Sequence, residues 1–143
     1  MRNAAAVYRS KYKADYFSGL YMAHEALGLG WQRGGARMMS HLNAVRQHEV
    51  MLLANRLDDS FAQCIYSVLA GYRDRLQVKS FNLALAFPPL GDVTGWEDFP
   101  LVARIVDRGD TADLSSDISA MELYGASVVT SDPFRTAGIL RNV

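Results

Sequence analysis

The sequence predicts an α+β domain built on a mostly antiparallel β-sheet with about three helices. Two observations lead to this prediction. In some segments apolar residues recur at steps of three and four, which is typical of helices that pack on one face. In others, short stretches alternate between large apolar residues and small or polar ones, which is typical of strands. The predicted order is helix, two strands, helix, two strands, a short strand and a final helix.

The composition limits the classes of function. A chain of 143 residues fits one domain, and an apolar content of 50% is enough for a core without disulfides or a structural metal. Fifteen basic residues balance fifteen acidic ones, which argues against a general nucleic-acid or anionic-membrane binder. No apolar run suits a signal peptide or approaches the roughly 20 residues of a membrane span. We therefore expect a soluble protein, and the single cysteine, Cys64, fits a reducing, cytoplasmic setting.

The first helix is predicted from about residue 14 to residue 29. Residues 1–11 before it are expected to form a flexible arm, and residues 12–143 a single domain. The helix is indicated by a mostly apolar stripe, which consists of Tyr16, Phe17, Leu20, Tyr21, His24 and Leu27. Four glycines between residues 28 and 35 then predict a flexible turn around Trp31.

Two strands and a long helix are predicted next. The strands, at 36–43 and 47–54, are expected to form an antiparallel pair joined by a turn at 43–46. Asp58 and Asp59 read as helix caps rather than as an acid–base pair. The helix that follows them is indicated by an apolar face, which consists of Phe61, Ile65, Val68, Leu69, Tyr72 and Leu76.

The later part of the chain is predicted to supply three more strands and a helix. Residues 79–87 place large residues on one face and small ones on the other, which indicates a central strand. The stretch FPLVARIVDRGD at 99–110 reads as a strand that ends in a turn. A short strand is expected at 127–130. Asp132 and Pro133 then suit the N-cap and first position of the last helix.

The two faces of the 99–110 strand raise the main functional question. One face would carry Leu101, Ala103, Ile105 and Asp107, and the other would carry Pro100, Val102, Arg104, Val106 and Arg108. Two arginines thus share a face with two valines. The question is why a half-buried strand would carry this combination.

The three histidines form no recognisable metal or catalytic motif. His24 lies in a helical stripe and reads as a packed histidine. His41 and His48 lie on adjacent predicted strands and could meet across the hairpin, but zinc requires three or four protein ligands. We therefore expect no metal there. Cys64 reads as a core residue, since no base accompanies it in the sequence. Glu122, in an apolar neighbourhood, reads either as a functional carboxylate or as a solvated charge.

The order of several segments resembles the C-terminal half of galactose-1-phosphate uridylyltransferase-like proteins, which belong to the histidine-triad superfamily. The segments are YFSGLYMAHEALGLGW, HLNAVRQHEVMLLAN, SFNLALAFPPL, VARIVDRGD and AMELYGASVVTSDPFRTAGILR. The resemblance covers residues 15–141 and implies a histidine-triad-like fold. In that family the N-terminal half carries the histidine that takes the nucleotide covalently, and the C-terminal half helps to hold the sugar phosphate.

The resemblance also implies a departure from the family's chemistry. In relatives the strand corresponding to residues 100–105 carries a His-x-His that points into the site, whereas this chain has Pro100 and Val102. A histidine nucleophile works because its imidazole can bond phosphorus and then leave, which neither proline nor valine can do. Arg104 follows on the same face and can hold phosphate through its planar fork.

Four residues are therefore candidates for ligand binding: Arg104, Arg108, Asn82 and Glu122. Asn82 matches an asparagine of the SFN strand, and Glu122 a glutamate of the sugar-contacting segment, although the neighbouring tyrosine is here Met121 and a downstream glutamine is Val128. The alternative interpretation is that Arg104 and Arg108 form ion pairs with Asp107 or Asp110.

Three functional hypotheses follow. The first is a nucleotidyltransferase-family half-domain that binds a nucleotide, sugar phosphate or other phosphate ester, needs no cofactor, and is completed by a partner N-terminal half or a second protomer. The second is a non-catalytic homo-oligomeric domain. The third is an independent enzyme that uses His41, His48 or Glu122 at a dimer interface. A twofold dimer is expected in the first two cases, because a half-domain leaves an apolar face or a sheet edge to cover.

Overall fold

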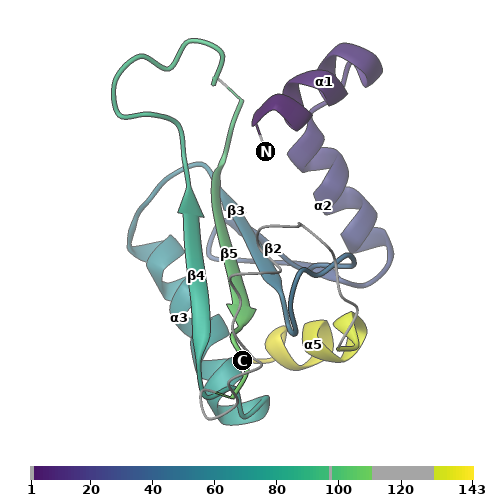
Figure 1. The fold of residues 1–143 in the computed structure, drawn as a ribbon, viewed down its shortest axis with the longest axis vertical. Helices are drawn as coiled ribbons and strands as arrows, with labels where there is room; N and C mark the ends of the chain where they lie inside the picture. The colour runs from purple at the N-terminus through teal and green to yellow at the C-terminus, as the bar shows by residue number, and fades with distance from the viewer. Residues whose placement is uncertain (1, 97, 111–130) are drawn as a thin grey trace.

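The computed structural model describes residues 2–96, 98–110 and 131–143, and shows helices around a five-stranded sheet (Figure 1). The strands lie in the order β1-β2-β3-β5-β4, and every neighbouring pair is antiparallel. They are β1 (Gly30–Arg33), β2 (Ala36–Ser40), β3 (Val50–Ala54), β4 (Phe81–Ala86) and β5 (Leu101–Asp107). The predicted α+β class is thereby confirmed, while the histidine-triad assignment stays a prediction.

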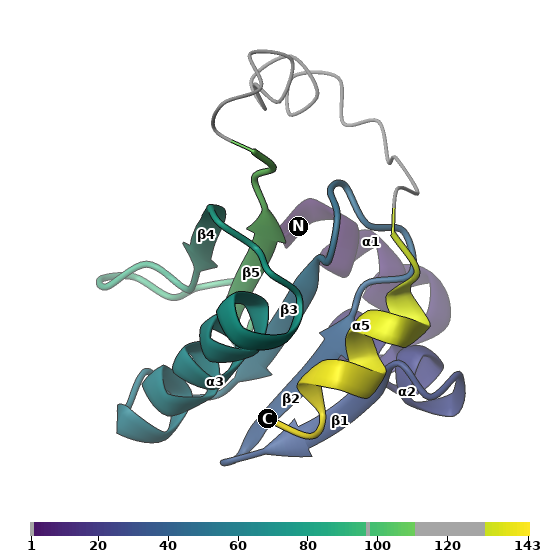
Figure 2. The same cartoon turned by 90° about the horizontal axis from the view of Figure 1, so that it is seen from below.

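Helices cover both faces of the sheet. They are α1 (Arg2–Tyr12), α2 (Tyr16–Ala26), α3 (Asp59–Arg75) and α5 (Pro133–Leu140). Helices α3 and α5 pack on one face over a large apolar cluster, and α2 packs on the other face over a smaller cluster, with α1 against α2 (Figure 2). In the described ranges no helix combines the length and apolarity that crossing a membrane requires.

The structure differs from the sequence prediction at the N-terminus. Helix α1 occupies the segment for which we predicted a flexible arm. The ring of Tyr8 lies 4.7 Å from that of Tyr12 and 5.6 Å from that of Tyr16, and Ala5 packs at the edge of the smaller cluster. These contacts give the helix a docking face that its largely polar sequence does not reveal.

Strand β1 corrects the prediction of a flexible turn around Trp31. The strand pairs with β2 from Gly30 opposite Met39 to Arg33 opposite Ala36. Gly34 and Gly35 form the two-residue turn between them, with φ values of 52° and 80°. Both positions of a tight hairpin turn of this kind need positive φ, which glycine adopts without steric cost. The glycines therefore make a hairpin rather than ending regular structure.

The predicted pairing of the next two strands is confirmed, with shorter strands. Strands β2 and β3 pair from Arg37 opposite Leu53 to Ser40 opposite Val50, and residues 41–49 form a longer connection than the predicted turn at 43–46. The connection is closed by the Glu49 side chain, which accepts a hydrogen bond from the Val45 N–H at 2.7 Å. His41 and His48 therefore lie in this connection and not on the strands.

Among the described strands, β4 lies at the edge of the sheet, whereas the sequence predicted a central strand. Of these strands it pairs with β5 alone. The predicted alternation is present, but the large residues lie at the margin of the sheet and stay exposed; they are Phe81, Leu83 and Leu85, followed by Phe87. Alternation in the sequence shows which residues share a face, and does not show how many neighbours a strand has.

The two faces of β5 and the caps of two helices match the prediction. Leu101, Ala103 and Ile105 belong to the cluster under α3 and α5, whereas Val102 belongs to the cluster under α2. Asp132 caps α5 by accepting from the Phe134 N–H at 2.9 Å, and Pro133 is the first helical residue. The predicted strand at 127–130 lies outside the described residues.

The cap of α3 gives a first test of the fold. The Asp58 carboxylate accepts a hydrogen bond from the Phe61 N–H at 3.0 Å, whereas Asp59 is the first residue of the helix. We expect Asp58→Ala to lower the free energy of unfolding by about 1 kcal/mol, because a helix N–H loses its partner. The matched variant Asp59→Ala loses only its interaction with the helix dipole, so it should cost about 0.3 kcal/mol. Urea unfolding of both variants measures the difference, and equal losses would contradict the assigned cap.

Candidate functional site

The position that corresponds to the family's second site histidine is filled by apolar packing. Val102 is fully buried, in a cluster with Phe17 and Tyr21 of α2 and Leu53 of β3. Pro100, which matches the first histidine, is also buried. Helix α2 therefore covers this part of the β5 face, and a ligand has no access to Val102.

Arg104, two residues further along the same face, is held by a buried carboxylate. The Oε1 atom of Glu49 accepts from Arg104 Nε at 2.7 Å and also from Arg104 Nη2, while its Oε2 atom accepts from the Val45 N–H. The Glu49 side chain is fully buried, and that of Arg104 is 32% exposed. An anion bound at Arg104 would therefore lie beside a buried negative charge, which disfavours it.

The predicted ion pairs of the β5 arginines have other partners. Arg104 pairs with Glu49, which lies 55 positions away in the chain, and Asp110 pairs with Lys79 at 3.4 Å. The Asp107 carboxylate accepts from the Gly109 N–H at 2.7 Å. Arg108 is exposed at the end of β5. Arg104 thus forms an ion pair, as the alternative interpretation expected, but its partner is Glu49 rather than Asp107 or Asp110.

Only part of the predicted ligand set comes together. Asn82 pairs with Val106, and the neighbouring pair is Ala84 with Arg104, so Asn82 and Arg104 share the α2 face of the sheet. This part of the face carries small side chains and is half-exposed. Glu122 lies outside the described residues, so its predicted role stays a prediction.

His24 and His41 adjoin the Arg104–Glu49 pair. The Nε2 atom of His24 accepts from the Leu42 N–H at 3.1 Å, so Nδ1 carries the proton and donates to the Leu20 carbonyl at 2.8 Å. His24 is therefore the packed histidine that its stripe predicts. The ring of His41 lies 5.3 Å from that of His24. Burial lowers the pKa of His41, and the Glu49 carboxylate opposes that effect.

His48 lies apart from this group, on the side of α3 and α5. Its N–H donates to Ser131 Oγ at 2.9 Å, and its Nδ1 lies 2.9 Å from Thr136 Oγ1 of α5. The Tyr72 hydroxyl of α3 donates to the His48 carbonyl. Since His41 lies in the group under α2, the hypothesis that His41 and His48 meet across the hairpin is wrong. Across the described ranges, no group of three or more His, Cys, Asp or Glu side chains is placed to hold a metal ion.

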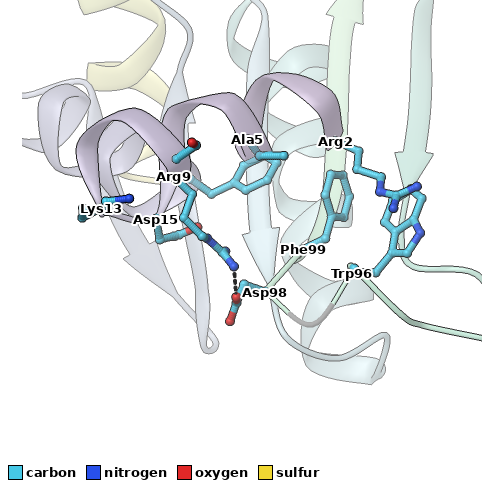
Figure 3. Close-up of a pocket in the computed structure, with 12 residues that line it drawn as sticks. Arg2, Ala5, Arg9, Lys13, Asp15, Trp96, Asp98 and Phe99 are labelled. Carbon is cyan, nitrogen blue, oxygen red and sulfur yellow. Dashed lines mark hydrogen bonds and ion pairs between the residues drawn. The ribbon is translucent and has the colours of Figure 1, made fainter.

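The structure adds a cavity that the sequence analysis missed (Figure 3). It has a volume of about 380 Å³ and lies between α1 and the loop that precedes β5. Arg2, Arg9 and Lys13 line it from the α1 side, and Trp96 and Phe99 line it from the loop. The spacing of Arg2, Arg9 and Lys13 places them within reach of one helix face. The prediction of a flexible arm for this segment does not reveal that these cations share a face.

Cys64 matches its predicted place in the core. It is buried against the β1–β2 hairpin, and its thiol lies 3.2 Å from the Arg33 carbonyl. Burial raises the pKa of this thiol, which disfavours the reactive thiolate. The residue is therefore placed for packing rather than for nucleophilic chemistry.

Comparison with known proteins adds no assignment to this geometry. Neither the family models scanned nor the curated proteins searched give a match to the chain.

The Arg104–Glu49 pair generates a prediction on stability. We expect Arg104→Ala to lower the free energy of unfolding by about 3 kcal/mol, because it leaves the buried Glu49 carboxylate without its cation. The matched variant Arg108→Ala removes an exposed arginine from the same strand and should cost less than about 0.5 kcal/mol. Urea unfolding measures both values. Similar losses in the two variants would show that the pair does not stabilise the fold.

The buried histidines generate a prediction on pH. Burial lowers the pKa values of both His41 and His48, so below the ordinary value of about 6.5 the unfolded chain binds protons that the folded chain resists. The free energy of unfolding should therefore be highest above that value and fall as the pH drops through it toward the lower folded-state pKa values. Denaturant midpoints across this range measure the slope. A double variant, His41→Gln with His48→Gln, should have a shallower slope, and an unchanged slope would rule out these histidines as its source.

Proposed function

We propose that this chain is a non-catalytic domain that works as a twofold homodimer, joined edge to edge through β4. One observation carries the proposal: in the part of the chain that the structure describes, β4 is a sheet edge whose outward backbone groups and large apolar side chains belong to the same residues. The packed face of β5 supports the non-catalytic part of it.

The direction of the β4 backbone follows from one hydrogen bond. The Arg108 N–H donates to the Ser80 carbonyl at 3.0 Å, so Ser80 bonds toward β5. In an antiparallel ladder alternate residues bond to the same neighbour, so Asn82 and Ala84 also bond toward β5. Phe81, Leu83 and Leu85 therefore direct their N–H and C=O groups away from the sheet, where another strand can pair with them.

The side chains of these three residues lie on the face that carries α3. Phe81, Leu83 and Leu85 pair with Asp107, Ile105 and Ala103, of which Ile105 and Ala103 belong to the core under α3 and α5. They are 46%, 39% and 43% exposed. Natural sheet edges are commonly protected by lysine, proline or a bulge, and the six residues FNLALA contain neither a charge nor a proline. An edge of this kind is stable in solution when a partner covers it.

A second copy of the chain fits this edge by symmetry. An antiparallel pair centred on Leu83 places Leu83 opposite Leu83 of the other copy, and Phe81 opposite Leu85 of the other copy. Every outward-facing residue then meets an outward-facing residue, and all six apolar side chains lie on one face. No charge opposes a like charge across the axis, since β4 has none. The interface is isologous, as a twofold dimer requires.

The β5 face supports a non-catalytic role. Val102 is buried under α2, and Arg104 is neutralised by Glu49. Chemistry at Val102 would require α2 to move away, and chemistry at Arg104 would require the buried ion pair to open. Both changes expose buried groups at a cost.

A second candidate function is the anion-binding half-domain. It is favoured by the partial exposure of Arg104, with Asn82 on the same face and Arg108 at its end. In this case a cytoplasmic partner N-terminal half supplies the histidine, and the ligand is a nucleotide or sugar phosphate. Thermal unfolding with UDP-glucose, UDP and glucose 1-phosphate tests it, because a ligand at about 100 times its Kd adds roughly 2.7 kcal/mol of stability. No shift with any of these ligands would contradict it.

The dimer predicts a specific response to one charge. We expect the wild-type chain to sediment as a dimer at micromolar concentrations, and Leu83→Glu to sediment as a monomer, because two carboxylates would face each other across the axis. The matched variant Leu57→Glu places the same charge on a leucine that is 66% exposed in the loop before α3, and it should remain dimeric. Sedimentation equilibrium measures all three masses.

A second variant separates dimer loss from misfolding. Leu83→Pro removes an outward N–H that the ladder with β5 does not use, so the sheet should persist while the dimer is lost. Circular dichroism reports whether the sheet persists. A monomeric wild-type chain at every concentration would overturn the proposal.

A further inference from the structure

The cavity beside α1 has the dimensions of a small-molecule site. Its volume of about 380 Å³ lies within the range of roughly 300–1,000 Å³ for ligand pockets. Figure 3 shows Arg2 beside Trp96 at one end, Lys13 at the other end and Arg9 between them. The cavity therefore differs in chemistry along its length.

One end of the cavity is aromatic. The rings of Trp96 and Phe99 lie 5.1 Å apart in an edge-to-face arrangement, and Phe99 meets Phe17 of α2 in the same way, also at 5.1 Å. The Arg2 guanidinium lies 4.9 Å from the centre of the Trp96 ring. Arg2 also lies close to the backbone of the loop, since a Cβ atom at Gly95 would lie 2.9 Å from Arg2 Nη2. A guanidinium and two aromatic rings provide flat surfaces for a planar group.

The other end of the cavity carries Arg9 and Lys13 together with Asp15 and Asp98. Its two carboxylates already have partners: Asp98 pairs with Arg9, and Asp15 caps α2 by accepting from the Ser18 N–H at 2.7 Å. Within the described part of the chain, neither Arg2 nor Lys13 has a carboxylate partner. Helix α1 adds no acid of its own, since no Asp or Glu occurs before Asp15. Three cations and two carboxylates line the cavity, which leaves one net positive charge for a ligand to neutralise, with Lys13 as the cation available at this end.

We propose that this cavity binds a nucleoside phosphate, with the base at the Trp96–Phe99 end and the phosphate at the Arg9–Lys13 end. At a rise of about 1.5 Å per residue, Arg9 lies roughly 10 Å along α1 from Arg2, and Lys13 follows the end of the helix, further from Arg2. A simple aryl phosphate holds its phosphorus close to its ring and does not span such distances. A nucleoside phosphate has a sugar between base and phosphate and spans them.

This site is separate from the one that the family resemblance implies. Its cations, Arg2, Arg9 and Lys13, all precede residue 15, where the resemblance begins. It also includes neither Arg104 nor the outward residues of β4. It can therefore be tested without reference to the proposed dimer.

The experiment is a titration of the full chain with ADP, followed by the indole N–H resonances in ¹H–¹⁵N spectra. The chain has two tryptophans, and Trp31 is buried in the core whereas Trp96 lines the cavity. We expect the Trp96 resonance to shift with saturation and the Trp31 resonance to stay in place. Lys13→Gln should weaken binding by about tenfold or more, because it removes a charged contact to the phosphate, and Arg2→Gln should also weaken it, because it removes the guanidinium that lies beside the base. Lys11→Gln, the matched control on the same helix, should change affinity by less than about twofold.

Three outcomes would overturn the proposal. One is no saturable shift of the Trp96 resonance with ADP. Another is an equal loss of affinity in Lys11→Gln and Lys13→Gln, which would indicate general attraction to the positive helix. The third is binding of inorganic phosphate as tightly as ADP, which would show that the aromatic end takes no part. Adenosine should bind more weakly than ADP if the Arg9–Lys13 end acts as proposed.

Discussion

Strand β5 is packed on both faces, and the rest of the structure depends on this double burial. Its odd-numbered residues, Leu101, Ala103 and Ile105, support the layer of α3 and α5, and Val102 supports the layer of α2. The strand also bonds to β3 on one side and to β4 on the other. Both apolar clusters contain residues of this strand, so close packing limits which side chains it can carry. A histidine in place of Val102 would disturb the cluster under α2.

The burial of the β5 face also explains why Arg104 is accompanied by the Glu49 carboxylate. An arginine on a strand under a helix needs a buried acceptor, and Glu49 provides one from the connection before β3. The carboxylate also accepts the Val45 N–H, so it orders the connection that carries His41. Arg104, which the sequence suggested as a ligand contact, is thus part of an internal network of hydrogen bonds that joins β5 to the β2–β3 connection.

Local patterns in the sequence were enough to predict the fold class, the β2–β3 pair, the two faces of β5 and the caps of α3 and α5. The errors arose where a local pattern has two structural outcomes. Glycines end a helix or form a tight hairpin turn, and the chain uses Gly34 and Gly35 for the hairpin. Glu49 was not predicted as the partner of Arg104 because the two are 55 residues apart in the chain. The cavity was missed because α1 is apolar on only a narrow face, and because the loop that it contacts is still more distant in the chain, with Asp98 lying 89 positions from Arg9.

The position of β5 between β3 and β4 has a consequence for how the chain folds during synthesis. Strand β4 is completed at Ala86, yet β5, its partner among the described strands, begins at Leu101, so β4 emerges before β5 can pair with it. Strand β3 waits longer for β5, since Val50 pairs with Ile105. Pairings between distant residues form slowly, and an unpaired apolar strand is prone to aggregate in the meantime. The segment FNLALA is therefore the part of the nascent chain that a chaperone has most reason to hold.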